Sequence, residues 1–242
     1  MIAFTRVALA FAALSFLAAC ATKPVVPFDR SSSGEMKTIG LVSPATPSGP
    51  SAVLASTVGQ SFGLVGALID AGIQANRESK LSSLLSGQNF SARDRLTDGI
   101  KASLEAQGYT VVSVPTTRTS TTAFLETYPP ASGEPKVDAY LDVVLNHYGY
   151  IAAGITAGTP YRPTLAATVR LVSARNSSVL MEDSIYYNPI GTYDQARHVT
   201  IAPDAEYSFG SFDTLTGSPE HAVAGLDTAF VKSTEAIAAL MR

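Results

Sequence analysis

Residues 137–150, VDAYLDVVLNHYGY, alternate between apolar and polar side chains over most of their length. Successive side chains of a strand point to opposite sides, so this alternation separates two faces. One face carries Val137, Ala139, Leu141, Val143 and Leu145, and the other carries Asp138, Tyr140, Asp142 and Asn146. The pattern predicts a β-strand with one buried face and one face toward solvent.

The residues that follow predict two more strands and a closing helix. Residues 164–174 repeat the alternation, residues 175–178 (RNSS) have the composition of a turn, and residues 179–187 return as the second strand of a hairpin. Residues 188–217 have no regular period. A serine and then proline at residues 218–219 are typical of a helix start. Apolar residues at helical spacing follow, at Val223, Leu226, Phe230, Ile237 and Met241.

The preceding residues predict a strand, a helix and a strand. Residues 36–43 (MKTIGLVS) form the first strand, and residues 109–114 (YTVVSV) form the second. Between them, Ser91 begins a helix in a capping pattern with Asp94, and Gly108 ends it. Together these elements predict an α+β fold: a mixed sheet of about five strands, helices packed on one side, and a C-terminal helix that closes the domain.

Residues 52–85 form a Gly/Ala-rich segment with apolar residues mostly three or four positions apart, which indicates a helix. Small residues at every fourth position suggest an assembly ridge, because they let another backbone approach closely. The ridge consists of Ala55, Gly59, Gly63, Ala67 and Ala71. Two interpretations remain open: a helix or helical hairpin that covers the sheet, or a helix that oligomerises or inserts into a membrane.

The first nineteen residues have the features of a secretion signal, with the cation Arg6 followed by an uncharged run. That run, of about 13 residues, is too short to cross a bilayer. Leu17-Ala18-Ala19-Cys20 resembles the lipobox of bacterial lipoproteins. The resemblance implies cleavage between Ala19 and Cys20, and attachment of the mature chain to a membrane by lipid on Cys20, the chain's single cysteine. Lipoproteins kept on the inner membrane of Gram-negative cells often carry aspartate after the cysteine, whereas this chain has Ala21, so the resemblance implies the periplasmic face of the outer membrane, or the outer face of the plasma membrane in a Gram-positive cell.

Cleavage would leave 242 − 19 = 223 residues, with a formal charge of 16 − 20 = −4. Residues 20–35 are rich in Pro and Ser and predict a lipidated flexible tether, and residues 36–242 predict a single periplasmic domain. The few basic residues are scattered along the chain, which argues against nucleic-acid binding. No nucleotide-binding motif occurs, and we expect no cofactor.

Candidate chemistry is sparse. Residues 59–63 (GQSFG) match the nucleophile elbow of serine hydrolases, with Ser61 as nucleophile and His198 or His221 placed later in the chain. The segment before Ser61 has helical spacing, however, whereas that motif follows a strand. His147, His198 and His221 are too far apart in sequence for a predicted metal site. Asp138 and Asp142 could form a carboxylate pair, but a solvated strand face explains them more simply.

Tyrosines concentrate in the second half of the chain, and Tyr140 and Tyr148 suggest a docking face for protein or glycan. The strand–helix–strand start, with Gly108-Tyr109 leading into the second strand, resembles periplasmic lipoprotein domains related to the curli-secretion lipoprotein. That resemblance implies a non-catalytic role in envelope structure or assembly, with an envelope protein partner or a homo-oligomer. The alternatives are a binding module for an envelope lipid or glycan, and a serine hydrolase.

Overall fold

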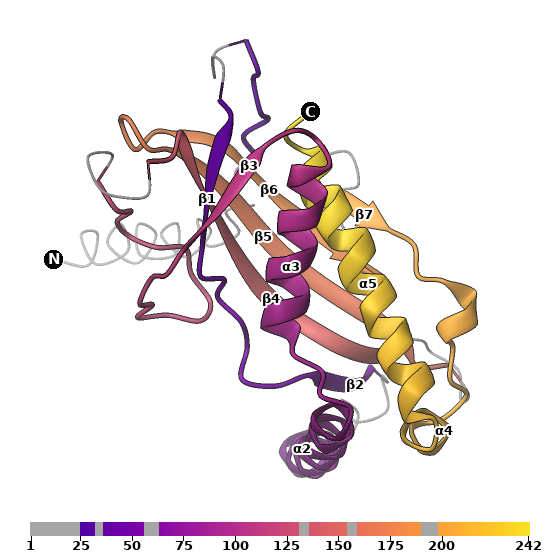
Figure 1. Ribbon diagram of the computed structural model, residues 1–242. Helices are drawn as coiled ribbons and strands as arrows, with labels where there is room; N and C mark the ends of the chain where they lie inside the picture. The colour runs from indigo at the N-terminus through magenta and orange to yellow at the C-terminus, as the bar shows by residue number, and fades with distance from the viewer. Residues whose placement is uncertain (1–24, 32–35, 56–62, 131–135, 154–158, 190–197) are drawn as a thin grey trace, which may run out of the picture.

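The structure is a computed structural model, and it describes residues 25–31, 36–55, 63–130, 136–153, 159–189 and 198–242 (Figure 1). Its centre is one seven-stranded sheet in the order β3-β1-β4-β5-β6-β7, with β2 also paired to β4. The strands are β1 (Thr38–Val42), β2 (Ser51–Ala55), β3 (Thr110–Val114), β4 (Ala139–Ala153), β5 (Arg162–Ser173), β6 (Val179–Tyr187) and β7 (Val199–Ile201). The helices are α2 (Gly63–Gly87), α3 (Ala92–Glu105), η3 (Ala205–Tyr207), α4 (Phe212–Thr216) and α5 (Pro219–Ala239).

The sheet is mixed. β4, β5 and β6 form an antiparallel meander, whereas β1, β2, β3 and β7 join it through parallel pairs. The predicted α+β class, the hairpin of residues 164–187 and the C-terminal helix are therefore confirmed. The sheet has two strands more than the predicted number. β7 is only three residues long and lies in a segment without regular period, and β2 lies where helical spacing was expected.

Helices α3 and α5 lie side by side on one face of the sheet (Figure 1). In α3 the Ser91 side chain accepts a hydrogen bond from the Asp94 backbone, as the capping pattern predicts. Gly108, just after the helix, has a φ of 90°, which glycine adopts without strain. The buried stripes of the two helices meet the predicted apolar face of β4 in one core, with Leu96, Ile100, Leu104, Leu226, Phe230, Ile237, Leu141, Val143 and Leu145.

The segment at 52–85 is a helix only in its second part. Residues 51–55 form strand β2, which pairs in parallel with Gly149–Ala153 at the far end of β4. Helix α2 begins at Gly63, and in its last turns Leu81 and Leu85 are buried in the core. The helix predicted for residues 52–55 is therefore wrong, because a few apolar residues fit a strand and a helix equally well. Among the described residues, no helix has the length and apolar character needed to cross a membrane.

The chain before the first predicted strand is partly docked on the sheet. Val26 and Glu182 exchange two backbone hydrogen bonds of 2.8 and 2.9 Å at the outer edge of β6. Phe28 packs against the core, and the Arg30 guanidinium donates to the Met241 carbonyl at 3.1 Å. The flexible tether predicted for residues 20–35 therefore does not extend over residues 25–31. Proline and serine content indicated flexibility, but Val26 and Phe28 supply specific contacts.

The second face of the sheet carries its own small cluster. Val42, Val114, Tyr140 and Ala174 are buried there, and Leu125, Tyr128 and Val137 pack against them. Leu125 and Tyr128 belong to the long connection between β3 and β4, so this connection covers part of the face that the helices leave open.

Candidate functional site

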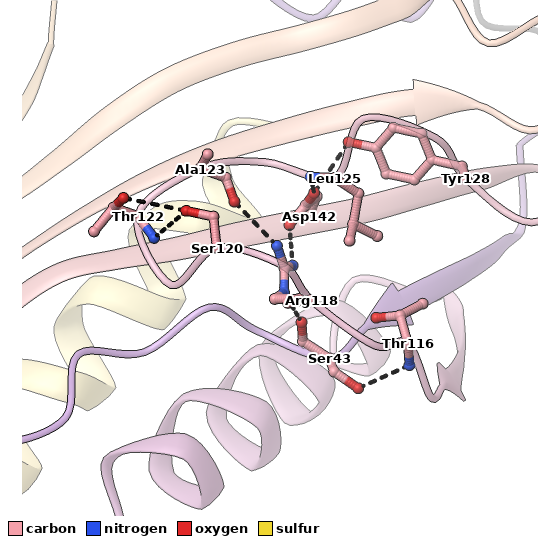
Figure 2. A network of polar contacts seen from close by, with 9 residues as sticks. All are labelled: Ser43, Thr116, Arg118, Ser120, Thr122, Ala123, Leu125, Tyr128 and Asp142. Atoms are coloured by element: carbon pink, nitrogen blue, oxygen red, sulfur yellow. Dashed lines mark hydrogen bonds and ion pairs between the residues drawn. The ribbon is translucent and has the colours of Figure 1, made fainter.

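The candidate site lies on this second face, where the connection between β3 and β4 passes over Asp142 of β4 (Figure 2). Asp142 lies two positions from Tyr140 on the same strand and is 0% exposed, although it was predicted on a solvated face. That prediction is wrong because the connection covers the carboxylate. A buried charge of this kind is costly unless it is paired and hydrogen bonded.

Three groups of the connection satisfy the Asp142 carboxylate. The Arg118 guanidinium forms an ion pair with Oδ1 of Asp142. Oδ2 accepts a hydrogen bond from the Leu125 backbone at 2.8 Å and one from the Tyr128 hydroxyl at 3.0 Å. We call these four residues, Arg118, Leu125, Tyr128 and Asp142, the Asp142 clamp. Burial, reinforced by the charge of Asp142, raises the pKa of Tyr128 far above its usual range, so its hydroxyl keeps the proton that it donates.

Arg118 also ties the connection to itself and to the end of β1. Its guanidinium donates to the Ser43 carbonyl at 2.5 Å and to the Ala123 carbonyl at 3.2 Å. The Thr116 backbone in turn donates to the Ser43 hydroxyl at 3.1 Å. Figure 2 shows the contacts with Ser43, Ala123 and Asp142 meeting at the Arg118 guanidinium. One side chain thus joins three chain segments.

A second ion pair continues the clamp across the sheet. Asp142 lies opposite Arg170 of β5, and Arg170 lies opposite Glu182 of β6. Arg170 donates to Glu182 at 2.7 Å, and its guanidinium carbon lies 4.2 Å from the centre of the Phe124 ring. Burial alone would lower the pKa of Arg170, but the hydrogen bond and charge of Glu182 outweigh it and raise that pKa. The guanidinium therefore stays charged and holds Phe124 by a cation–π contact.

This arrangement holds a loop rather than a reacting group. Both oxygens of Asp142 accept hydrogen bonds and neither is exposed, so the carboxylate has no access to a substrate or a hydrated metal. No group of three His, Asp or Glu side chains within the described ranges could hold a metal ion. The loop surface has only a small recess of about 160 Å³, lined by residues 117–120 and 123–127.

Asp138 and Asp142, considered in the sequence as a possible carboxylate pair, have separate hydrogen-bond partners. Asp138 lies at the end of the sheet, where its carboxylate accepts hydrogen bonds from the Lys37 and Thr38 backbones, both at 2.8 Å. Asp142 faces the clamp instead. Asp138 and Asp142, four positions apart in sequence, therefore have two different structural roles.

Tyr140 and Tyr148 do not share one docking face. Tyr140 is 2% exposed and stacks on Tyr128 on the second face, at 5.8 Å between ring centres. Tyr148 is 8% exposed and packs under the helices with Phe90 and Phe230. A β-bulge between Leu145 and His147 shifts the register by one residue, which moves Tyr148 to the helix side. The expectation of a joint docking face is corrected accordingly.

The assembly ridge is not one continuous helical feature. Ala55 ends strand β2, whereas Gly63, Ala67 and Ala71 belong to helix α2. Gly59 lies outside the described residues, as do Ser61 of the hydrolase motif and the cleavage site at Ala19 and Cys20. Sequence reasoning also missed Arg118 and Tyr128. Arg118 had one available signal, since it is the only cation in the Thr/Ser-rich segment that precedes the buried strand.

The three histidines considered in the sequence lie apart from the clamp. His198 approaches Asp183 with its Nδ1 at 3.4 Å from Oδ1, beside the β6–β7 edge. His221 contacts the Glu206 carbonyl through Nε2 at 3.1 Å, at the start of α5. His147 lies 3.2 Å from the Thr164 hydroxyl through Nε2. The three rings therefore occupy three different places.

Comparisons with known proteins place this chain near three solved structures at low similarity. Protein XCC0632 from Xanthomonas campestris, described by the family model DUF330, is 10% identical with a TM-score of 0.43, and the match covers 90% of this chain and 89% of that one. A PelC variant from Paraburkholderia phytofirmans, described as a dodecamer, is 10% identical with a TM-score of 0.39, over 86% and 91%. Lipoprotein GNA1162 from Neisseria meningitidis is 14% identical with a TM-score of 0.23, over 62% and 81%.

No family model and no curated protein matches this chain. Identities and TM-scores this low do not assign a function. The function is therefore argued from the residues of the chain itself.

Proposed function

We propose that this protein is a non-catalytic lipoprotein of the cell envelope, held by lipid on Cys20 at the periplasmic side of the outer membrane, that docks a partner protein on residues 116–127. The observation that carries the docking role is the Asp142 clamp. A fully buried carboxylate fixes an irregular loop onto a sheet, and the loop keeps its other side toward solvent.

A loop held in this way is suited to recognition. Residues on loops that a rigid scaffold positions are often those that bind partners. The clamp joins the loop to β4 through Asp142 and to the end of β1 through Ser43, so the loop is ordered before a partner arrives. The loop then loses less conformational entropy when it binds the partner, which favours affinity.

The outer surface of the loop supplies hydrogen-bonding groups. Its exposed side chains include Thr117, Thr119, Thr121, Thr122 and Thr127. Each hydroxyl both donates and accepts, so the row matches the backbone groups of an extended partner segment. Arg118 and Asp142 neutralise each other inside the clamp, so the exposed charge of residues 116–127 is that of Glu126.

Site-specific photo-crosslinking in the intact envelope tests this proposal. A photoreactive residue at Thr121 should give one defined crosslinked product, whereas the same residue at Gln88, exposed at the end of α2, should not. The Asp142→Asn substitution should abolish the Thr121 product while the protein remains folded, because the loop loses its fixed position. Equal products at Thr121 and Gln88, or a Thr121 product that survives Asp142→Asn, would contradict docking on this loop.

A second candidate function is binding of an envelope lipid or glycan. The observation that favours it is a recess of about 640 Å³ between α2 and α4, a volume within the range of small-molecule sites. Ile73, 45% exposed, and Phe212 supply apolar walls, and the Arg77 guanidinium lies 6.0 Å from the centre of the Phe212 ring. These groups suit an amphipathic ligand with an anionic part.

Binding of a fluorescent acyl-chain probe distinguishes this candidate. Probe binding that Phe212→Ala weakens about tenfold, and that Thr121→Glu leaves unchanged, would favour the recess over the loop. The hydrolase alternative has its own test, because labelling by a serine-reactive phosphonate that disappears in Ser61→Ala would replace both proposals.

A further inference from the structure

From the place where residues 25–31 dock, we infer that the end of the domain bearing the C-terminus faces the lipid headgroups of the anchoring membrane, and that the opposite end, with β2 and α4, points away. This inference rests on the lipid anchor of the proposed function and adds an orientation to it. We call the two ends proximal and distal. In Figure 1 the proximal end carries the label C, and the distal end carries α2 and α4.

The first argument is the length of chain between the lipid and the fold. Val26 is fixed to β6 by its two backbone hydrogen bonds with Glu182. From Cys20 to Val26 there are 26 − 20 = 6 Cα steps, which span at most about 22 Å in any conformation. The anchored residue therefore stays within that radius of the docking point.

The distal end lies outside that radius. Glu182 is at the level of Arg170, which pairs with Asp142, whereas the distal end lies at the level of Ile151 and Arg162. The nine residues from Asp142 to Ile151 span about 30 Å along the strand. Because the tether cannot reach so far, the domain cannot stand on its distal end. By contrast, Val179 of the proximal end is only three residues from Glu182, about 10 Å.

The second argument is the distribution of charge. Backbone hydrogen bonds connect the chain segments of the proximal end. The Thr110 amide donates to the Lys37 carbonyl, the Asp138 amide to the Thr38 carbonyl and the Ala174 amide to the Asp138 carbonyl. Among the described residues of this end, the exposed basic side chains are Arg30, Lys37, Lys136, Arg175 and Arg242 and the exposed acidic ones are Asp29, Glu105 and Asp138, which gives 5 − 3 = +2; Glu35 and Glu134 lie outside the described residues. The other described residues carry 9 basic and 14 acidic side chains, or 9 − 14 = −5.

The helix face is more acidic than the proximal end. Among the described residues of α3 and α5, it exposes Asp94, Asp98, Glu220 and Glu235 against Arg93, Arg95 and Lys101, which gives 3 − 4 = −1, and the side beside β7 exposes Glu206. Anionic lipid attracts nearby Lys and Arg side chains and repels carboxylates. The proximal end also presents Val179, 41% exposed, and a recess of about 300 Å³ lined by Phe28, Arg30, Met36, Lys37 and Tyr109. Among the surfaces that the tether can bring to the membrane, this end fits anionic headgroups best.

The experiment uses the full lipidated chain in vesicles of three parts phosphatidylcholine to one part phosphatidylglycerol. Fluorophores are attached through Val179→Cys at the proximal end and, in a second protein, through Asp213→Cys at the distal end, because Cys20 is the only native cysteine. Headgroup-linked spin-labelled lipid quenches only nearby fluorophores. We expect quenching at residue 179 to be at least threefold that at residue 213. Equal quenching, or stronger quenching at residue 213, would overturn the inference.

Two further changes test separately the two causes of the orientation, the charge of the proximal end and the length of the tether. Lys136→Glu with Arg175→Glu should lower the quenching at residue 179, whereas Lys80→Glu with Arg93→Glu, the same charge change elsewhere, should not. A spacer of twenty Gly and Ser residues after Thr22 should also reduce the difference between the two labels. A difference that survives both the spacer and the proximal charge reversal would overturn the inference, since neither stated cause would then act.

The mass of the purified protein distinguishes failure of the orientation from failure of the anchor. A mass without diacylglycerol, with the chain recovered in the aqueous fraction, would overturn the proposed lipid anchor and this inference with it. A lipidated mass with equal quenching at both labels would overturn the orientation alone.

Discussion

Arg118 and Asp142 form an ion pair in which almost no charge reaches solvent, with side-chain exposed fractions of 9% and 0%. The two residues come from a Thr/Ser-rich loop and from the longest strand of the sheet. Removal of one partner from such a pair leaves the other buried without compensation, which costs more than the pair itself contributes. The loop therefore depends on Asp142 for its position, and Asp142 depends on the loop for its neutralisation.

Substitution of Asp142 tests this dependence. Asp142→Ala removes the acceptor for the Arg118 guanidinium, the Leu125 backbone and the Tyr128 hydroxyl. We expect the free energy of unfolding to fall by about 3–5 kcal/mol, the range for a broken buried ion pair. Urea denaturation followed by circular dichroism measures the change. The control is Asp227→Ala at the Arg95–Asp227 pair, whose side chains are 46% and 37% exposed and whose loss should cost less than about 1 kcal/mol.

Substitution of Gly149 in β4 should disturb the contact between β2 and β4. Gly149 has a φ of 142°, and a Cβ there would lie 2.0 Å from the Ser51 carbonyl oxygen of β2. Gly149→Ala should therefore push β2 away from β4 and lower the unfolding midpoint by several degrees. Gly210→Ala, where a Cβ would have no neighbour within 4 Å, should leave the midpoint close to that of the native protein. Similar midpoints for the two variants would show that β2 is not held at Gly149.

Hydrophobic alternation predicted β4 and β5, because Leu141, Val143, Leu165 and Val169 of these strands enter the core, and the turn composition of residues 175–178 predicted β6 as the strand that pairs back on β5. The capping residues of α3 and the proline of α5 predicted where these helices start, because such signals depend only on residues close together in sequence. The bulge was not predictable in this way. Asn146 is left out of the pairing with β5, and nothing in its neighbours marks the one-residue shift that carries Tyr148 to the other face.

The candidate site was missed because it joins residues that are distant in sequence. A polar strand position was interpreted as an exposed one, and that interpretation holds for a face that meets water. Asp142 instead meets Arg118, 24 residues earlier in the chain. An irregular loop has no periodicity from which its covering role could be predicted, so only the tertiary contacts reveal the clamp. For the same reason Val26 could not be predicted to leave the tether and pair with Glu182.

The docked segment before β1 should contribute measurably to stability. A soluble variant that begins at residue 25 keeps the Val26–Glu182 hydrogen bonds, the Phe28 packing and the Arg30 contact with Met241. A variant that begins at residue 36 loses all three. We expect the shorter variant to be less stable by about 2–3 kcal/mol, the effect of one partly buried aromatic side chain and a few hydrogen bonds. Equal urea midpoints would contradict docking of this segment on the sheet.

His147 should make stability depend on pH. Burial lowers the pKa of His147, whose ring lies 3.2 Å from the Thr164 hydroxyl on the sheet. The unfolded chain, with an ordinary histidine pKa near 6.5, then binds more protons than the folded one as pH falls, so the contribution of His147 is complete above about pH 6.5 and is lost below it. His147→Gln, which removes the titration and keeps a hydrogen-bonding group, should lessen the decrease in unfolding free energy between about pH 7.5 and pH 5.5. Urea denaturation at both pH values measures that decrease in each protein. Carboxylates titrate in both proteins, so their contribution to the decrease cancels in the comparison. An identical decrease with and without the imidazole would show that protonation of His147 does not limit the acid stability of the fold.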